Sequence, residues 1–187
     1  SQVRDLFKYS LDEGSFSGHA FGNLFLTALE KMTGSFAAAL NFAEDILRVQ
    51  GNVVPITLDD IIMSAKTGEK VYRGEYLAAH QKFDLKSPPE ITVEKKDGGE
   101  ALANPEAIKA IYNADIVVIA PGNLYGSLAP TLGVPGVGEA LRQTEAKTVY
   151  VTNLVTKPGQ TDDFSVDNFS SEIERMAGGE FLDYVIY

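Results

Sequence analysis

A short, almost entirely apolar segment between two helix-like segments is the feature that most constrains the fold of this chain. Residues 115–120 read Asp-Ile-Val-Val-Ile-Ala, a pattern typical of a strand whose two faces are both covered. A helix signal precedes it, with Asn104 as the cap and Pro105 at the first helical position. Two further helix and strand pairs follow, ending in a strand at residues 182–187. We therefore predict an α/β fold, namely a three-layer α/β/α Rossmann-like sheet.

The first half of the chain has a different pattern. Residues 19–32 and the segment after Ser35 each place apolar side chains on one helical face, which predicts an αα-hairpin. Residues 53–95 then carry several short strand-like runs separated by turn residues, beginning with Val53–Ile56. These runs predict an antiparallel excursion from the main sheet.

Length, charge and cysteine content narrow the function. A chain of 187 residues fits one domain over residues 1–187. Its formal net charge of −10, with no cysteine, argues against nucleic-acid binding, disulfides and thiolate chemistry. No apolar run reaches the length that spans a bilayer. We expect a cytoplasmic protein with no membrane partner, and we leave open whether it forms a homo-oligomer.

The loop after the apolar strand is the first candidate site. Gly122 and Gly126 would let backbone amides approach a ligand, and Asn123 and Ser127 offer polar side chains. In open α/β sheets, ligands bind in such loops at the carboxyl ends of the strands. A plain turn rich in glycine and proline explains the same residues equally well. No P-loop and no dinucleotide-type glycine motif follows a strand in this chain.

The loop over residues 153–162 is the second candidate site, because it is long for a strand-to-helix connection. Asn153 lies at the end of a strand, where its amide could bridge loops or contact a ligand. Thr161 and Asp162 come shortly before a helix. Their alternative role is to shape the start of that helix as turn or capping groups.

A third candidate segment opens the first long helix. Gly18 permits an unusual backbone, Gly22 permits close packing, and His19 stands beside them. A lone histidine at a helix start is more often a structural hydrogen-bonding group than a catalytic base. Asn23 lies among apolar neighbours, so we expect its amide to be buried and to need a partner or a ligand.

Together these segments resemble one known family. Residues 18–24 are similar to its motif Gly-His-Ser-x-Gly-Asn-Leu. Residues 115–127, together with 134–136, resemble "DAIVIGPGSLYTS…VPG", and residues 153–162 resemble "NLMTQPGETDG". The chain is thereby identified as resembling the gluconeogenesis factor (YvcK-type, UPF0052) family, which is related to the 2-phospho-L-lactate transferase CofD. Its departures from the quoted motifs include Ala120, Asn123, Gly126, Lys157 and Gln160.

The resemblance implies that these residues form the central part of a longer CofD-like domain. Family members open with a Gly-Gly-Gly-Thr-Gly phosphate-binding loop and an acidic metal-associated segment, neither of which occurs in this sequence. The resemblance implies a small nucleotide ligand. One form of it is a nucleotide diphosphate that binds together with Mg²⁺. Within the matched motifs, Asp162 is the one acidic residue that could help to hold such a metal. We expect these residues without the glycine-rich loop to bind nucleotide weakly or not at all.

Two functions follow from the resemblance. The first is a nucleotide-sugar or dinucleotide-binding regulatory protein, needed for carbon metabolism and cell shape. In the predicted site, Gly122, Asn123 and Ser127 contact phosphate and ribose, and Asn23 and Asn153 anchor the ligand in the same crevice. The alternative is a transferase that moves a phospholactyl group from a nucleotide diphosphate carrier to a deazaflavin-type hydroxyl acceptor. We favour the regulatory protein, because the residues supply no obvious base and nucleophile pair.

Overall fold

The computed structural model describes residues 2–74, 82–83 and 87–187. By their internal contacts the residues divide into two compact units, Ser1–Pro55 and Ile56–Tyr187. The single domain expected over residues 1–187 stays a prediction, because each unit is defined by its own contacts alone. Parts of the expected excursion, residues 75–81 and 84–86, lie outside the described residues.

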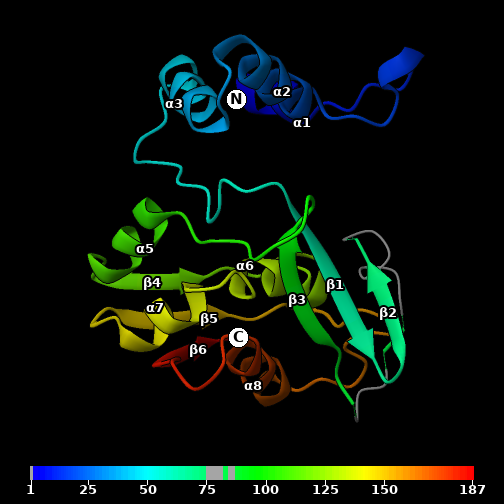
Figure 1. Cartoon of the computed structure of the whole chain (residues 1–187), viewed down its shortest axis with the longest axis vertical. Helices are drawn as coiled ribbons and strands as arrows, with labels where there is room; N and C mark the ends of the chain where they lie inside the picture. The colour runs from blue at the N-terminus through cyan, green and yellow to red at the C-terminus, as the bar shows by residue number, and fades with distance from the viewer. Residues whose placement is uncertain (1, 75–81, 84–86) are drawn as a thin grey trace. The chain divides into compact units, whose positions relative to one another are not determined.

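The first unit is helical, as expected (Figure 1). Its central feature is the hairpin formed by α2 and α3, which is closed by Gly34 in the left-handed region at φ 75°. Ser35 caps α3, because its side chain accepts a hydrogen bond from the Ala38 amide. A small core fills the hairpin, made of Leu29, Ala39 and Ala43. The elements of this unit are α1 (Gln2–Lys8), a 3-10 helix (Gly14–Phe16), α2 (Phe21–Thr33) and α3 (Phe36–Leu47).

The second unit begins with an antiparallel sheet, which confirms the predicted excursion. Its strands are β1 (Ile61–Thr67), β2 (Lys70–Arg73) and β3 (Glu90–Lys95), in the order β2-β1-β3. The strand expected at Val53–Ile56 is wrong, because these residues are irregular in the structure. Pro55 has no amide hydrogen to donate to a ladder, and the Val53 amide bonds instead to the Glu44 carboxylate.

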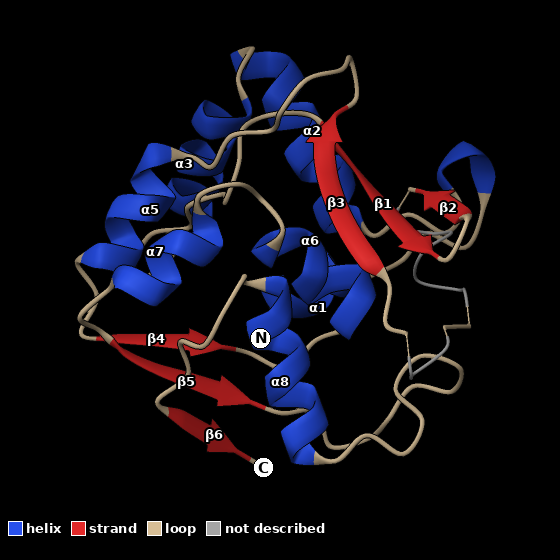
Figure 2. Ribbon diagram, turned by 60° about the horizontal axis from the view of Figure 1, so that its bottom comes forward, coloured by secondary structure: helices blue, strands red, loops and turns tan. Residues whose placement is uncertain are grey.

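A parallel sheet with helices on one side forms the rest of the second unit (Figure 2). Its order β4-β5-β6 follows the chain, and all pairs are parallel. Asn104 and Ser165 cap the helices that follow them, and Ser165 does so in a capping box. The strands are β4 (Ile116–Ile119), β5 (Lys147–Val151) and β6 (Tyr184–Ile186). The helices are α5 (Pro105–Tyr112), a π-helix (Leu124–Leu128), α6 (Ala129–Leu132), α7 (Val137–Gln143) and α8 (Val166–Met176).

The mixed α/β class is therefore confirmed, but the two faces of the parallel sheet differ. On one face, side chains such as Val117 and Tyr150 join the main core with Phe169 and Ile173 of α8. On the other face, Ile116 is 60% exposed. Within residues 56–187, the helices α5, α7 and α8 contribute to the core on the first of these faces, through side chains such as Ile108, Leu141 and Ile173.

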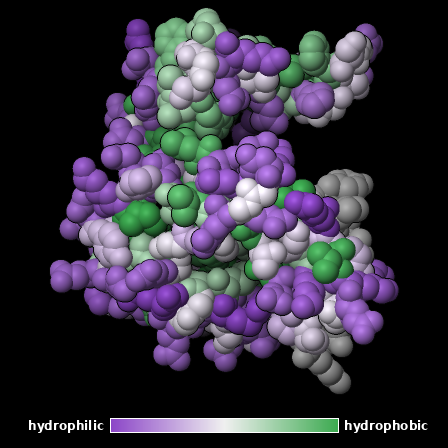
Figure 3. All heavy atoms as spheres, viewed as in Figure 1, coloured by the Kyte–Doolittle hydropathy of each residue, from purple (hydrophilic) through white to green (hydrophobic). Residues whose placement is uncertain are grey.

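The surface is rich in hydrophilic side chains, in keeping with the net charge of −10. They cover much of the face drawn in Figure 3, with smaller apolar areas between them. In the described part of the chain, no helix combines the length and the apolar character that crossing a bilayer requires.

Candidate functional site

The two loops predicted as sites begin at the same edge of the parallel sheet. Strands β4 and β5 are neighbours and parallel, with Ile119 opposite Tyr150. The two strands therefore end side by side. Residues 120–123 follow β4, and residues 152–165 follow β5. This is the carboxyl edge, where open α/β sheets bind their ligands.

The side chain of Asn153 joins the two loops. Its Oδ1 accepts a hydrogen bond from the Gly122 amide at 3.0 Å, and its Nδ2 donates to the Gly122 carbonyl at 2.8 Å. One amide side chain thus pairs with both polar groups of one residue, 31 positions away in the sequence. Of the two roles expected for Asn153, the structure shows the bridge between loops.

Asn123 organises the first loop in a similar way. Its side-chain oxygen accepts a hydrogen bond from the Gly126 amide at 3.1 Å, at the start of the π-helix. The amides of Gly122 and Gly126, expected to face a ligand, therefore each donate to an asparagine side chain in the structure. Ser127 lies within the π-helix and is exposed. A side chain at Gly122 would approach Leu128 to 3.3 Å, so the glycine also allows close packing.

A buried polar network anchors the first loop to α8. Tyr125 is 1% exposed, and its hydroxyl donates a hydrogen bond to Glu172. Arg175 holds the same carboxylate with two nitrogens at 2.6 Å, and it also donates to the Pro89 carbonyl. Burial, together with the Glu172 charge, raises the pKa of Tyr125 well above its usual range. The ring of Phe83 packs against Tyr125 edge-on, with 5.1 Å between centroids.

The second loop is held by its own side chains. Thr161 is 3% exposed, and its hydroxyl accepts a hydrogen bond from the Lys157 amide at 2.7 Å. Asp162 accepts from the Gly159 amide at 2.5 Å. These contacts match the turn-forming roles considered from the sequence.

Both loops line one cavity of about 300 Å³, where amide, hydroxyl and lysine side chains lie beside the apolar Leu124, Val155 and Pro158. We call it the polar cavity after the first group. Asn123 comes from the first loop, and Asn153, Lys157 and Thr161 come from the second. Lys157 is the one charged residue among those that line it, and no carboxylate does so. In a chain with a net charge of −10, a cavity with this lining favours an anionic group.

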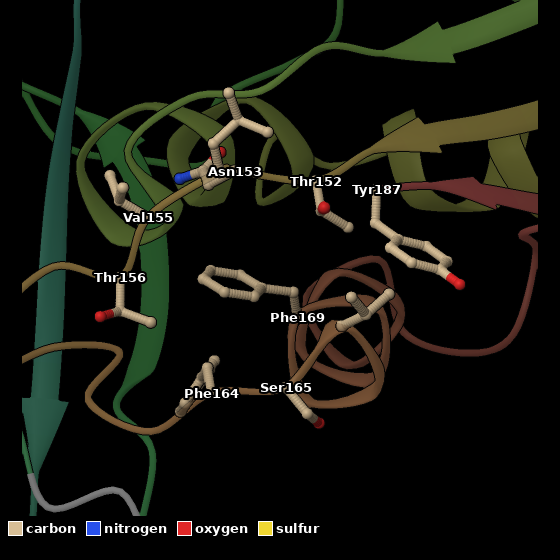
Figure 4. A pocket seen from close by; sticks show the side chains of 10 residues that line it. Thr152, Asn153, Val155, Thr156, Phe164, Ser165, Phe169 and Tyr187 are labelled. Carbon is tan, nitrogen blue, oxygen red and sulfur yellow. The ribbon is translucent and has the colours of Figure 1, made fainter.

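A second cavity of about 370 Å³ lies on the other side of the same loop. Figure 4 shows the Phe169 ring extending from α8 into the space between Asn153 and Phe164. The two rings meet edge to face, with 5.2 Å between centroids. Tyr187 lines the far end of the cavity. Its aromatic rings suit a planar group, and Thr152, Thr156 and Ser165 add hydroxyls to the lining. Asn153, Val155 and Thr156 are shared with the polar cavity.

The third predicted segment lies in the first unit. Gly18 has a positive φ of 84°, and Gly22 packs against Phe7, as expected from the sequence. His19 and Asn23 are exposed, so the expectation that Asn23 is buried is wrong. That Asn23 shares a crevice with Asn123 and Asn153 stays a prediction, because the two units are defined separately.

The described residues do not assemble a metal centre. Among residues 2–74, 82–83 and 87–187, the structure contains no group of three or more histidine, aspartate or glutamate side chains placed to hold an ion. The role of Asp162 as a metal ligand stays a prediction.

Two parts of this region were not predicted from the sequence. One is the network of Tyr125, Glu172 and Arg175. The other is the aromatic cavity at the start of α8. A polar aromatic residue inside a glycine-rich loop was a usable signal for the first, because a buried tyrosine hydroxyl generally needs a partner.

The fold and the paired loops define an α/β protein in which two loops meet at the carboxyl edge of a parallel sheet. Comparison with known proteins identifies its family. The family model described as 2-phospho-L-lactate transferase CofD matches residues 1–187. The chain belongs to this CofD family.

Its relatives in the family include named gluconeogenesis factors. The chain is 36% identical over 185 residues to the putative gluconeogenesis factor of Clostridium acetobutylicum, covering 98% of this chain and 41% of that protein. It is 32% identical to the gluconeogenesis factor of Bacillus subtilis, covering 57% of it. A crystal structure of a UPF0052 family member from Bacillus halodurans matches with a TM-score of 0.85 at 30% identity, covering 98% of this chain and 58% of that one. The chain thus spans about half the length of the relatives it matches.

Proposed function

We propose that this chain carries part of the ligand site of a regulatory protein of the gluconeogenesis-factor type, and that the ligand is a nucleotide-sugar or a dinucleotide. The observation that carries the proposal is the polar cavity shared by the loops after β4 and β5, with Lys157 as its one charged lining residue. Such a cavity suits a diphosphate, which is compact and anionic. The proposal includes a cytoplasmic protein that supports carbon metabolism and cell shape.

The neighbouring aromatic cavity supports a ligand with a planar ring. Phe164 and Phe169 line it, and it shares Asn153 with the polar cavity. A nucleotide has this combination, an anionic end joined to an aromatic base. The part of the ligand that joins its anionic end to its base would then lie along residues 153–156, which line one or both cavities.

Titration of this chain with nucleotide compounds tests the proposal. We expect uridine and guanosine diphosphate compounds or a dinucleotide to bind weakly, with a Kd of about 1 mM or less tight. In NMR spectra the shifted resonances should cluster in the two loops and around Phe169. Resonances that stay unchanged at saturating nucleotide, or shift only in the first unit, would contradict the proposed site.

Lys157→Gln sharpens the test, because glutamine stands at this position in the family motif. If Lys157 meets the diphosphate, the variant should bind about 10-fold more weakly, equivalent to about 1.4 kcal/mol. Lys66→Gln is the matched control, since Lys66 is exposed on β1 and pairs only loosely with Glu90 at 4.0 Å. Equal loss in both variants would mean that only the global charge matters.

The alternative function is a transferase that moves a phospholactyl group from a nucleotide diphosphate carrier to a hydroxyl acceptor. The observation in its favour is the family model, which is described by a phospholactate transferase. In that reaction the acceptor hydroxyl attacks the phosphorus that carries the lactyl group, the P–O–P bond of the carrier breaks, and a nucleoside monophosphate leaves with the displaced oxygen. Mg²⁺ would neutralise the diphosphate of the bound carrier, so it should strengthen binding of that ligand. Binding that is independent of Mg²⁺ favours the regulatory protein.

A further inference from the structure

Residue 83, in the segment between β2 and β3, contacts both loops of the candidate site. The Phe83 amide donates a hydrogen bond to the Gly159 carbonyl of the second loop at 2.8 Å. The Phe83 ring packs against Tyr125 of the first loop, with 5.1 Å between centroids, and the side chain is 7% exposed. These two contacts place the preceding residue, Lys82, beside the second loop.

The side chain of Lys82 lies against the turn at Gly159. A Cβ atom at Gly159 would come within 2.6 Å of Lys82 Cγ, so the aliphatic part of the lysine packs directly on the glycine. Gly159 stands between Pro158 and Gln160, which both line the polar cavity. Gly159 and Lys82 are not among the described residues that line it. Lys82 is therefore one backbone turn away from the cavity, and it acts on a bound anion through its electric field rather than by contact.

The charge of Lys82 is not neutralised by a neighbour in the described part of the chain. Lys82 is exposed and forms no ion pair there, whereas four other lysines each pair with a carboxylate: Lys66, Lys95, Lys96 and Lys147. Asp162 places a negative charge at the same turn, where its carboxylate accepts a hydrogen bond from the Gly159 amide. Lys82 thus offsets the charge of Asp162, which opposes an anion beside Lys157.

We propose that Lys82 is a second cation of the polar cavity, which acts across the Gly159 turn and makes the site selective for ligands of high negative charge. This proposal rests on the proposed function, because it assumes that the anionic end of the ligand lies beside Lys157. The energy of a charge acting at a distance is proportional to the charge of the ligand. Salt screens such an interaction between exposed groups beyond about 8 Å, but it screens a direct contact less.

Titrations of Lys82→Gln, followed by NMR, test the dependence on ligand charge. The probes are uridine, uridine monophosphate and uridine diphosphate, which share one nucleoside and differ in charge. At low salt, Lys82→Gln should weaken diphosphate binding about 3-fold, monophosphate binding less, and uridine binding not at all. Lys82→Glu should weaken diphosphate binding about 10-fold, since reversing the charge doubles the change in binding free energy. Lys82→Arg should bind like the wild type.

Added salt separates the field of Lys82 from the contact of Lys157. At about 0.5 M salt the effect of Lys82→Gln should disappear, while Lys157→Gln should still weaken binding. Lys66→Gln is the matched control and should change binding at neither salt concentration. An equal loss for all three probes, or a loss that persists at high salt, would mean that Lys82 holds the turn in place or contacts the ligand. Either result would overturn the proposal.

Failure of this proposal differs from failure of the proposed function. If the wild type binds the diphosphate and Lys157→Gln weakens binding, but Lys82→Gln leaves it unchanged at low salt, the proposed function stands and Lys82 has no part in it. If the diphosphate shifts no resonance of the two loops in the wild type, both proposals are wrong.

Discussion

The loops after β4 and β5 leave the same sheet edge but are built differently. The first loop is part of the core, since Leu124 is 2% and Tyr125 is 1% exposed. The second contains Leu154 and Val155, which are 93% and 76% exposed, although Thr161 near its end is only 3% exposed. It is held by hydrogen bonds within the loop, by the bridge from Asn153 to Gly122 and by the Phe83 amide, which donates to the Gly159 carbonyl. The comparison indicates one fixed wall and one adjustable wall of the same site. A ligand can then select a conformation of the second loop while the first stays in place.

The largest effect should come from removing the anchor of the fixed loop. Tyr125→Ala deletes a fully buried ring and its hydrogen bond to Glu172, so we expect a loss of about 4 kcal/mol of unfolding free energy. Leu154→Ala in the adjustable loop should change stability by less than about 0.5 kcal/mol. Urea denaturation of both variants measures the difference. Similar losses in the two would remove the distinction between the loops.

The bridge between the loops should come next. Asn153→Ala leaves the amide and carbonyl of Gly122 without their partner, and we expect a loss of about 2 kcal/mol. The fixed loop should keep its structure, while hydrogen exchange in residues 154–160 should speed up. A variant in which exchange in residues 122–127 rises equally would show that the bridge holds both loops.

Alkaline pH offers a probe of the fixed loop without removing its ring. Burial raises the pKa of Tyr150 to about 12, and burial with the Glu172 charge raises the pKa of Tyr125 further. Since the unfolded tyrosines ionise near pH 10, stability should be intact below that pH and fall above it. The slope should be about 1.4 kcal/mol per pH unit for each tyrosine.

Tyrosine to phenylalanine variants check this pH dependence. Denaturation curves measured between pH 10 and 11 give the slope of unfolding free energy against pH. Tyr125→Phe and Tyr150→Phe should each remove the contribution of one tyrosine from that slope. A slope unchanged by both substitutions would mean that neither hydroxyl is protected by the fold.

The smallest effect is expected at Asp162 in the adjustable loop. Its carboxylate accepts one hydrogen bond from the Gly159 amide, so Asp162→Asn should cost at most about 1 kcal/mol of stability. Nucleotide affinity should stay nearly unchanged. Calorimetric titration with and without Mg²⁺ is the measurement. Loss of binding together with loss of its Mg²⁺ dependence, at unchanged stability, would support the transferase instead.

Local signals predicted much of the fold. Asn104 and Ser165 cap helices as expected, because capping is decided within four residues of sequence. The strand predicted at Val53–Ile56 is wrong. The β-branched residues there favour a strand, but Pro55 lacks the amide hydrogen that a strand ladder needs. The exposure of Ile116 on β4 could not be predicted either. An apolar strand shows that cover is favourable, but not which polypeptide supplies it.

The site was predictable in position but not in detail. Polar residues after two successive strands placed Asn123 and Asn153 at one edge of the sheet. That both would bind glycine amides depends on loop conformation, and so does the π-helix after Asn123. The network of Tyr125 and Glu172 joins residues from distant parts of the chain, which single-sequence patterns do not reveal.

The short separation of 31 residues between Gly122 and Asn153 has a consequence for folding. Contacts that close short loops cost little chain entropy and form early. The two strands and the bridge between their loops can therefore assemble before α8 and β6 have joined the sheet. During synthesis the polar cavity would take shape first, and the aromatic cavity would be completed when Phe169 and Tyr187 arrive from the later chain.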